Sequence, residues 1–265
     1  MLKAVAFDLW ETLISDTPEQ SRAQERLRLD RMESTLRERG LTATADAIED
    51  AYRQLWHRCH ELYWSADRDI SCRRQIEHFL EELQLDVASF DESVLLELEH
   101  AYANAAVEIL PTIVDGATEV LQAVRDQGMR VGLISNTGRT PGYALREILG
   151  RLGLASSIDV MLFSNEHGAC KPQPSIFEEL RHGLGVEFEE LMFVGDNLYV
   201  DVHGAQQCGM RAVHFIPPKR GTAVAPDVDH GLHIVADATI RDLRELPAVV
   251  EALRYPPALR TRTKA

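Results

Sequence analysis

Short apolar runs, most of them ending at a polar residue, constrain the fold of this chain more than any other feature. A short and almost continuously apolar run is typical of a strand that is buried on both faces, as in a parallel sheet. Five such runs occur, at residues 2–7, 129–134, 160–163, 191–194 and 211–216. Helical patterns separate the later runs, at residues 117–126, 142–152, 174–184 and 199–208. This alternation predicts an α/β fold with a doubly wound parallel sheet.

Residues 15–109 break this alternation, because they contain helical patterns and no strand-like run. Thr17, Pro18 and Gln20 form a helix start, with an N-cap, a proline in the first turn and a capping-box glutamine. A glycine at position 40 is expected to end that helix. Two further helices are predicted over residues 73–83 and 91–107. A helix after position 40 is predicted from apolar residues that are spaced 4, 3, 4 and 3 apart and therefore lie on one face. They are Ile48, Tyr52, Leu55, Cys59 and Leu62.

These patterns predict two domains. A structureless loop of such length is implausible in a compact protein, so residues 15–109 are expected to form an inserted all-helical domain. The α/β core then comprises residues 1–14 and 110–255. Residues 217–231 are expected to form a loop, and residues 256–265 a flexible tail.

Charge and cysteine usage limit the partners and the compartment. The chain has 42 acidic and 28 basic residues and a net charge of −14, which argues against binding nucleic acid or an anionic membrane through bulk charge. Its four scattered cysteines favour a reducing compartment. No apolar run approaches the roughly 18 residues of a membrane span, and Asp8 interrupts the stretch that a signal peptide would continue. We therefore expect a cytoplasmic protein without nucleic-acid or membrane partners, and the oligomeric state stays open, a homodimer included.

Four short motifs lie at predicted strand ends, where doubly wound sheets bind their ligands. In chain order they are FDLWET at residues 7–12, ISNT at 134–137, CKP at 170–172 and GDNLYVD at 195–201. Each motif alone is a weak signal. Their order and placement together favour the attack of a carboxylate on a phosphoryl group.

Such an attack needs a divalent cation, hydrogen-bond donors and a positive charge beside the phosphoryl oxygens. Asp8 and Asp196 supply two carboxylate oxygens of the kind that Mg²⁺ prefers, and the backbone carbonyl near Trp10 could supply a third. The Ser135 hydroxyl and nearby amides supply donors. Lys171 supplies the positive charge.

The four motifs, their order and their spacing resemble the haloacid dehalogenase (HAD) superfamily of hydrolases. The resemblance covers residues 2–8 and about 110–216, and it implies a Rossmann-like core with the insertion as a helical cap. It implies that Asp8 is the nucleophile that forms an aspartyl-phosphate. It also implies that Asp196 and Asp201 complete a magnesium site, where Asp201 could instead orient Lys171.

The same resemblance assigns the remaining site residues. Ser135 binds the phosphoryl group and Lys171 neutralises it, while Thr12 belongs to the catalytic motif. Asn136 and Trp10 are expected to contact the substrate. The chain has four lysines and 24 arginines, so an unconstrained basic position would more often be arginine. The lysine at position 171 therefore favours a functional role.

Trp10 departs from the pattern of the phosphatases in this superfamily, which carry there a second aspartate as general acid and base. An indole cannot serve in that role, and general acid–base catalysis typically contributes about 10² to 10⁴ in rate. Leaving groups that depart without a proton, such as acyl phosphates or activated phenols, would suffer least. A histidine of the insertion could replace the acid, and Glu11 is a weaker substitute.

Two alternatives stand beside a magnesium-dependent phosphatase of small phosphorylated metabolites. With an aromatic residue at position 10, the chain also resembles the 2-haloacid dehalogenases, whose aspartate attacks carbon without a metal. Those enzymes typically lack a carboxylate at the place of Asp196, and two neighbouring carboxylates favour a cation between them. The other alternative is a catalytically silent HAD-fold binding protein, for which Trp10 is the argument. The phosphonatase branch needs a lysine in its cap, and residues 15–109 contain none.

Overall fold

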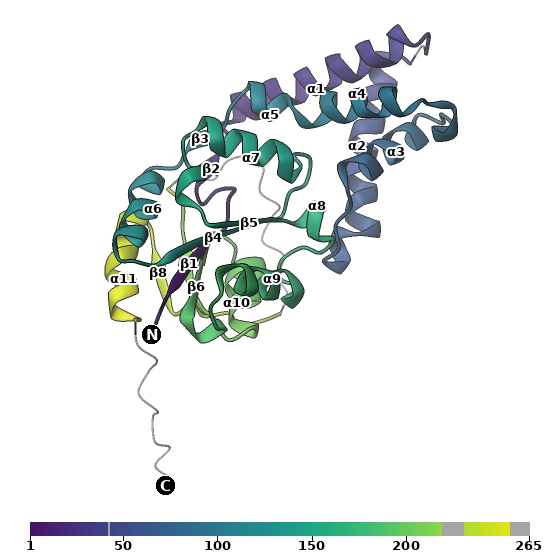
Figure 1. The fold of residues 1–265 in the computed structure, drawn as a ribbon. Coiled ribbons are helices and arrows are strands. Elements are labelled where there is room, and N and C mark those ends of the chain that lie inside the picture. Colours follow the sequence, from purple (N-terminus) through teal and green to yellow (C-terminus); the bar gives the residue numbers. More distant parts are fainter. Residues whose placement is uncertain (42, 219–230, 255–265) are drawn as a thin grey trace.

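The computed structural model describes residues 1–41, 43–218 and 231–254, and its centre is a six-stranded sheet (Figure 1). Every neighbouring pair of strands is parallel. The order across the sheet is β5 (Val160–Phe163), β4 (Arg130–Ser135), β1 (Ala4–Phe7), β6 (Leu191–Gly195), β7 (Arg211–Phe215) and β8 (Ala238–Ile240). The prediction of an α/β doubly wound parallel sheet is confirmed. Five of these strands lie within two residues of their predicted runs, and β8 was not predicted.

Helices cover both faces of the sheet, as the continuously apolar strands require. In β1, Val5 and Phe7 pack into one apolar core, and Ala4 and Ala6 pack into the other. The first core is completed by α6 (Ala117–Asp126), α7 (Gly142–Arg151) and α11 (Leu246–Ala252). The second is completed by α9 (Pro174–Leu184) and α10 (Gly204–Gln207).

The strand order reverses beside β1, and this reversal positions the functional side chains. After β1 the chain forms β4 and β5 on one side, then crosses to build β6, β7 and β8 on the other. Ligands bind at such a switch point, beyond the carboxyl ends of the strands. Asp8 directly follows β1, Asp196 directly follows β6, and Ser135 is the last residue of β4.

Five helices lie between the first strand and the rest of the core and project from it as a separate arm (Figure 1). The chain enters this helical insert through β2 (Ile14–Ser15) and leaves through β3 (Thr112–Ile113), and the two strands pair in antiparallel fashion. The insert's two connections therefore lie side by side. Its helices are α1 (Pro18–Glu38), α2 (Ala45–Leu62), α3 (Cys72–Glu82), α4 (Glu92–Ala103) and α5 (Ala105–Glu108).

Details of the insert follow the sequence with two corrections. The predicted capping box is present, since the Thr17 hydroxyl accepts the Gln20 N–H and the Gln20 side chain accepts the Thr17 N–H. Four residues of the predicted face of α2 are buried, whereas Leu62, the last residue of that helix, is 45% exposed. The predicted helix over 91–107 is interrupted at Asn104, which ends α4 and precedes α5.

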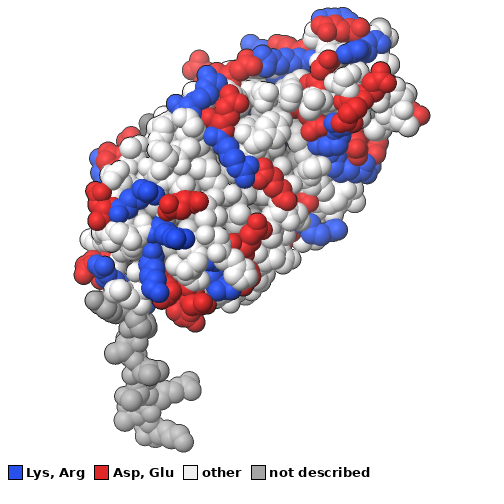
Figure 2. Space-filling view, in the orientation of Figure 1, with Lys and Arg blue, Asp and Glu red and all other residues white. Residues whose placement is uncertain are grey.

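Two predicted segments lie largely or wholly outside the described residues. These are the loop at 217–231 and the tail at 256–265. Among the helices that are described, none combines the length and apolar character needed to cross a membrane. On the face shown in Figure 2, basic and acidic side chains are interspersed over the insert and the core. That face therefore carries no extended surface of one charge.

Candidate active site

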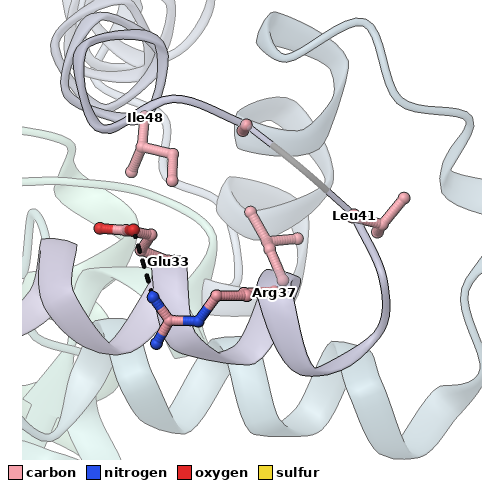
Figure 3. A pocket seen from close by; sticks show the side chains of 6 residues that line it. Glu33, Arg37, Leu41 and Ile48 are labelled. Atoms are coloured by element: carbon pink, nitrogen blue, oxygen red, sulfur yellow. Dashed lines mark ion pairs between the residues drawn. The ribbon is translucent and has the colours of Figure 1, made fainter.

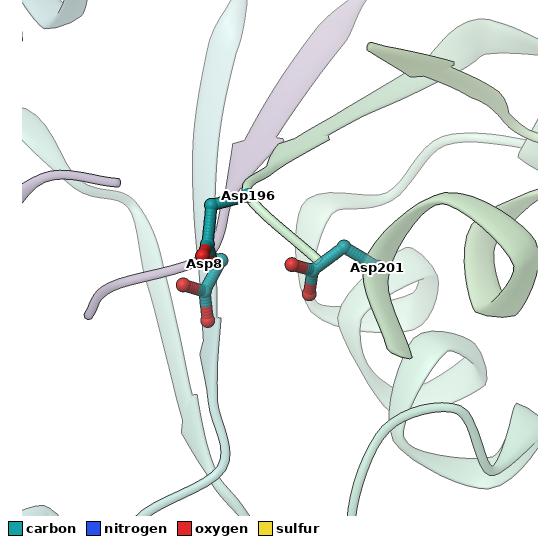
Figure 4. Close-up of side chains that lie close together, drawn as sticks. All are labelled: Asp8, Asp196 and Asp201. Atoms are coloured by element: carbon teal, nitrogen blue, oxygen red, sulfur yellow. The ribbon is translucent and has the colours of Figure 1, made fainter. Parts of the chain in front are cut away.

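Three buried aspartates converge beyond the strand ends (Figure 4). Asp8 and Asp196 follow adjacent strands, and Asp201 lies in the π-helical segment η5 (Leu198–His203). One carboxylate oxygen from each lies within 4.8 Å of the others. Figure 4 shows the Asp8 and Asp196 side chains together, with the Asp201 carboxylate pointing toward them.

Lys171 binds two of these carboxylates and is only 1% exposed. Its Nζ donates to Asp8 Oδ1 at 2.6 Å, to Asp201 Oδ1 at 2.7 Å and to the Ile134 carbonyl at 3.1 Å. An ammonium group has three donors, so these bonds use all of them and fix the position of Nζ. The structure thus brings the predicted lysine to the predicted nucleophile.

Burial and charge act in opposite directions on the ionisation of this group of residues. Burial lowers the pKa of Lys171, but Asp201 and Asp8 more than offset this, so its pKa is raised and the ammonium stays charged. Burial raises the pKa of Asp8 to about 6, with Lys171 opposing the rise and Asp201 adding to it. Asp8 is therefore harder to ionise here than in water, mainly because it is buried.

The donor set fits a divalent cation. Three ionised carboxylates and one ammonium sum to −3 + 1 = −2 in a buried space. All three acidic ligand atoms are hard oxygens of the type that Mg²⁺ takes. Asp201 is already bonded to Lys171 and accepts the Asn197 N–H at 3.0 Å. Asp8 and Asp196 are accordingly better placed than Asp201 to contact an ion directly.

The remaining predicted residues surround this centre. The Thr12 hydroxyl donates to Asp8 Oδ2 at 3.3 Å. The side chain of Asn136 is bound to the backbone of Lys171 by two hydrogen bonds, as donor to its carbonyl at 3.0 Å and as acceptor from its N–H at 2.8 Å. Ser135 is fully buried at the end of β4. Asn136 thus links the loop that follows β4 to the segment that contains Lys171.

Trp10 lies in the tight turn after Asp8. It is half-buried and forms an isolated bridge with Ile14. Within the described part of the chain, no hydrogen bond joins its side chain to Asp8. Glu11 follows it in a left-handed conformation with φ 61° and is 1% exposed.

A widened helical turn places Asp201, and the sequence did not predict it. Residues 199–208 were expected to form one α-helix, but a π-helical turn comes first and α10 starts only at Gly204. The Asn197 side chain begins this turn by accepting the N–H groups of Tyr199 and Val200. Such turns occur often at functional sites.

Gly195 leaves the room that Asp201 needs. A Cβ at position 195 would lie 2.3 Å from Asp201 Oδ2, so a side chain cannot be accommodated there without moving the carboxylate. This explains the glycine in the GDNLYVD motif through packing against the site.

A small pocket in the insert is unrelated to this centre (Figure 3). It has a volume of about 90 Å³ and lies between α1 and the start of α2. Its walls include Leu41, Ile48 and the ion pair of Arg37 with Glu33 at 3.5 Å. None of the predicted site residues lines it.

Comparison with known proteins gives a consistent result. A family model described as haloacid dehalogenase-like hydrolase matches residues 2–209. The glyceraldehyde 3-phosphate phosphatase of Pyrococcus abyssi is 30% identical over 215 residues, which cover 81% of this chain and 82% of that protein.

Two solved structures have the same fold. A 2-haloacid dehalogenase from Pseudomonas syringae pv. tomato matches with a TM-score of 0.66 and 25% identity, over 95% of this chain and 99% of that chain. A HAD phosphatase from Thermococcus onnurineus matches with a TM-score of 0.57 and 25% identity, over 94% and 98%. The family model spans most of the chain, so this protein belongs to the haloacid dehalogenase-like hydrolases and is a hydrolase.

Proposed function

We propose that the protein is a magnesium-dependent phosphatase of small phosphorylated metabolites that acts through an aspartyl-phosphate at Asp8. The convergence of three buried carboxylates on one lysine carries this proposal, because their net charge of −2 calls for a divalent cation. The similarity to a glyceraldehyde 3-phosphate phosphatase supports a small phosphorylated substrate. The predicted roles of Asp8, Ser135, Asn136 and Lys171 enter as parts of this proposal.

In the proposed reaction a carboxylate oxygen of Asp8 attacks phosphorus. The bond from phosphorus to the leaving group breaks, and its electron pair departs with that group. Water then attacks the aspartyl-phosphate, which restores the carboxylate and releases phosphate. The Thr12 hydroxyl and the Lys171 ammonium, which already donate to Asp8, orient the nucleophile.

Charge stabilisation comes from the same residues. Lys171 stabilises negative charge on the transferring oxygens, and the Ser135 hydroxyl with neighbouring amides donates to them. Asp201 keeps Lys171 charged and in place through its 2.7 Å bond. A bound Mg²⁺, held by Asp8, Asp196 and the Trp10 carbonyl, would offset the phosphoryl charge.

Trp10 restricts the substrates that turn over well. Since an indole cannot protonate a leaving group, acyl phosphates and activated aryl phosphates should react fastest. Trp10 would contact the substrate as an apolar surface beside the nucleophile. A catalytically silent protein would bind such ligands without turning them over.

A 2-haloacid dehalogenase is the second candidate. The aromatic Trp10 lies two residues after the proposed nucleophile Asp8. A protein named as a 2-haloacid dehalogenase shares the fold at a TM-score of 0.66. Asp196 argues against it, because a second buried carboxylate beside the nucleophile favours a bound cation.

A substrate panel separates these functions. Phosphorylated metabolites and an activated aryl phosphate are incubated with Mg²⁺ or with a chelator, and 2-haloacids are tested in the chelator. Mg²⁺-dependent phosphate release supports the proposal. Halide release in the chelator would identify a dehalogenase, and ligand binding without any turnover would identify a silent binding protein.

A further inference from the structure

The helical insert reaches the core through a short segment between α2 and α3, directly beside Lys171. Cys170 donates its N–H to the Asp67 carbonyl at 2.9 Å, and Asp69 donates its N–H to the Gly168 carbonyl at 3.1 Å. Arg68 and Ala169 form an antiparallel bridge between these two bonds. Residues 67–69 of the insert therefore pair with residues 168–170 of the core, and Lys171 is the next residue.

The side chain of Asp69 extends this contact to the loop that follows β4. Its Oδ2 accepts hydrogen bonds from Ser164 Oγ at 2.5 Å and from Thr137 Oγ1 at 3.1 Å. Ser164 Oγ in turn accepts the Thr137 N–H at 2.8 Å. Thr137 lies two residues after Ser135, so one carboxylate of the insert holds both the loop after β4 and the start of the loop that leads to Lys171.

Asp69 is nearly buried and is stabilised by hydrogen bonds alone. It is 7% exposed, and its other oxygen accepts the Trp64 indole N–H at 2.9 Å and the Ile70 N–H at 2.8 Å. No ion pair joins it to a basic side chain in the described residues. Hydrogen bonds to an ionised acceptor are about twice as strong as neutral ones. The contact of Asp69 with the core therefore consists of hydrogen bonds to two hydroxyl groups.

We propose that Asp69 is a positioning residue for phosphoryl transfer, which couples docking of the helical insert to the placement of the Ser135–Thr137 loop and Lys171. This inference rests on the proposed function. Asn136 already binds this loop to the Lys171 backbone from the core side. Asp69 supplies the opposing contact from the insert, so the two loops reach their reactive arrangement only when the insert is docked.

The first measurement is kinetic and uses Mg²⁺ and an activated aryl phosphate. Asp69→Asn removes the charge that both core hydroxyls contact, and Thr137→Val removes one of these hydroxyls, so either variant tests the proposal if the other fails to fold. We expect each to lower kcat about ten-fold or more, with a smaller change in KM. The double variant should lose less than the sum of the two single losses, because both changes affect the bond between Asp69 and Thr137.

A matched control removes an acid whose hydrogen bonds, within the described residues, stay inside the insert. Glu97 bonds to Arg39 on a neighbouring helix of the same insert at 3.1 Å. Glu97→Gln should therefore keep the wild-type kcat. Wild-type kcat in Asp69→Asn, or fully additive losses in the double variant, would overturn the proposal.

The second measurement does not depend on activity. Hydrogen exchange of the full chain should show faster exchange over residues 135–140 and 164–171 in Asp69→Asn than in the wild type or Glu97→Gln. Unchanged exchange there would also overturn the coupling. If the wild type releases no phosphate, the proposed function fails, and the exchange experiment alone decides whether Asp69 couples the insert to these loops.

Discussion

Replacing Lys171 by methionine tests the electrostatic account of the site. Methionine is similarly long and unbranched, so the change removes the charge and three donors with little change in volume. The ammonium is 1% exposed and bonds Asp8 at 2.6 Å and Asp201 at 2.7 Å. Removing one partner of a buried ion pair typically costs about 3–5 kcal/mol, and we expect a loss of that size in the free energy of unfolding.

The loss should depend on pH in a defined direction. Lys171 lowers the pKa of Asp8, so in the variant this pKa rises above its present value of about 6. The folded variant then holds a proton that the unfolded chain releases near 3.8, the ordinary value. Since the native state binds more protons, stability falls as pH rises through this interval. The penalty should therefore be larger near pH 8 than near pH 5.

Urea unfolding in a chelator at these two pH values measures the effect. Lys3→Met is the matched control, because Lys3 pairs with Glu190 at 2.6 Å on the surface, with its side chain 55% exposed; its loss should be far smaller. Turnover of an aryl phosphate with Mg²⁺ should fall about 10²- to 10³-fold in Lys171→Met. Wild-type stability of Lys171→Met near pH 8 would refute the reasoning.

Three further variants test other parts of the site and its support. Trp10→Asp should raise turnover of phosphate esters with unactivated alcohols by about 10² to 10⁴ and that of aryl phosphates much less; an unchanged ratio of the two rates would count against a missing general acid. Gly195→Ala should lower turnover by displacing Asp201, since the new Cβ would lie 2.3 Å from Oδ2; a wild-type rate would contradict this. Burial raises the pKa of Asp16 to about 6 despite a hydrogen bond from Gln24. The wild type should therefore lose stability as pH rises from about 4 to 7, and the stability of Asp16→Asn relative to the wild type should rise over that range. Thermal melts across that range measure it, and a gain independent of pH would show that the cause lies elsewhere.

The core could be predicted from sequence because its strands are buried on both faces. Such strands appear in the sequence as continuous apolar runs, and the polar residue that follows most of these runs marks the end of the sheet where ligands bind. The start of α1 was equally predictable, since a capping box is a local interaction. β8 was not predicted, because it has three residues, of which only Ile240 is buried, and they form no continuous apolar run.

The parts that escaped prediction depend on contacts between distant segments. The π-helical turn serves a carboxylate that must meet Lys171, 30 residues away in sequence. Asp69 lies 68 residues from Thr137 and 95 from Ser164, and nothing in its local sequence distinguishes it from a solvated loop acid. The role proposed for Asp69 rests on its position in the fold and not on a sequence motif.

The most direct test of the central claim replaces the proposed nucleophile. Asp8→Asn keeps the shape of the side chain and removes the attacking carboxylate, and turnover of an activated aryl phosphate is measured with saturating Mg²⁺ beside the wild type. The account predicts that the wild type releases phosphate only with Mg²⁺ and that Asp8→Asn releases none above background. Full Mg²⁺-dependent phosphate release by Asp8→Asn would contradict it.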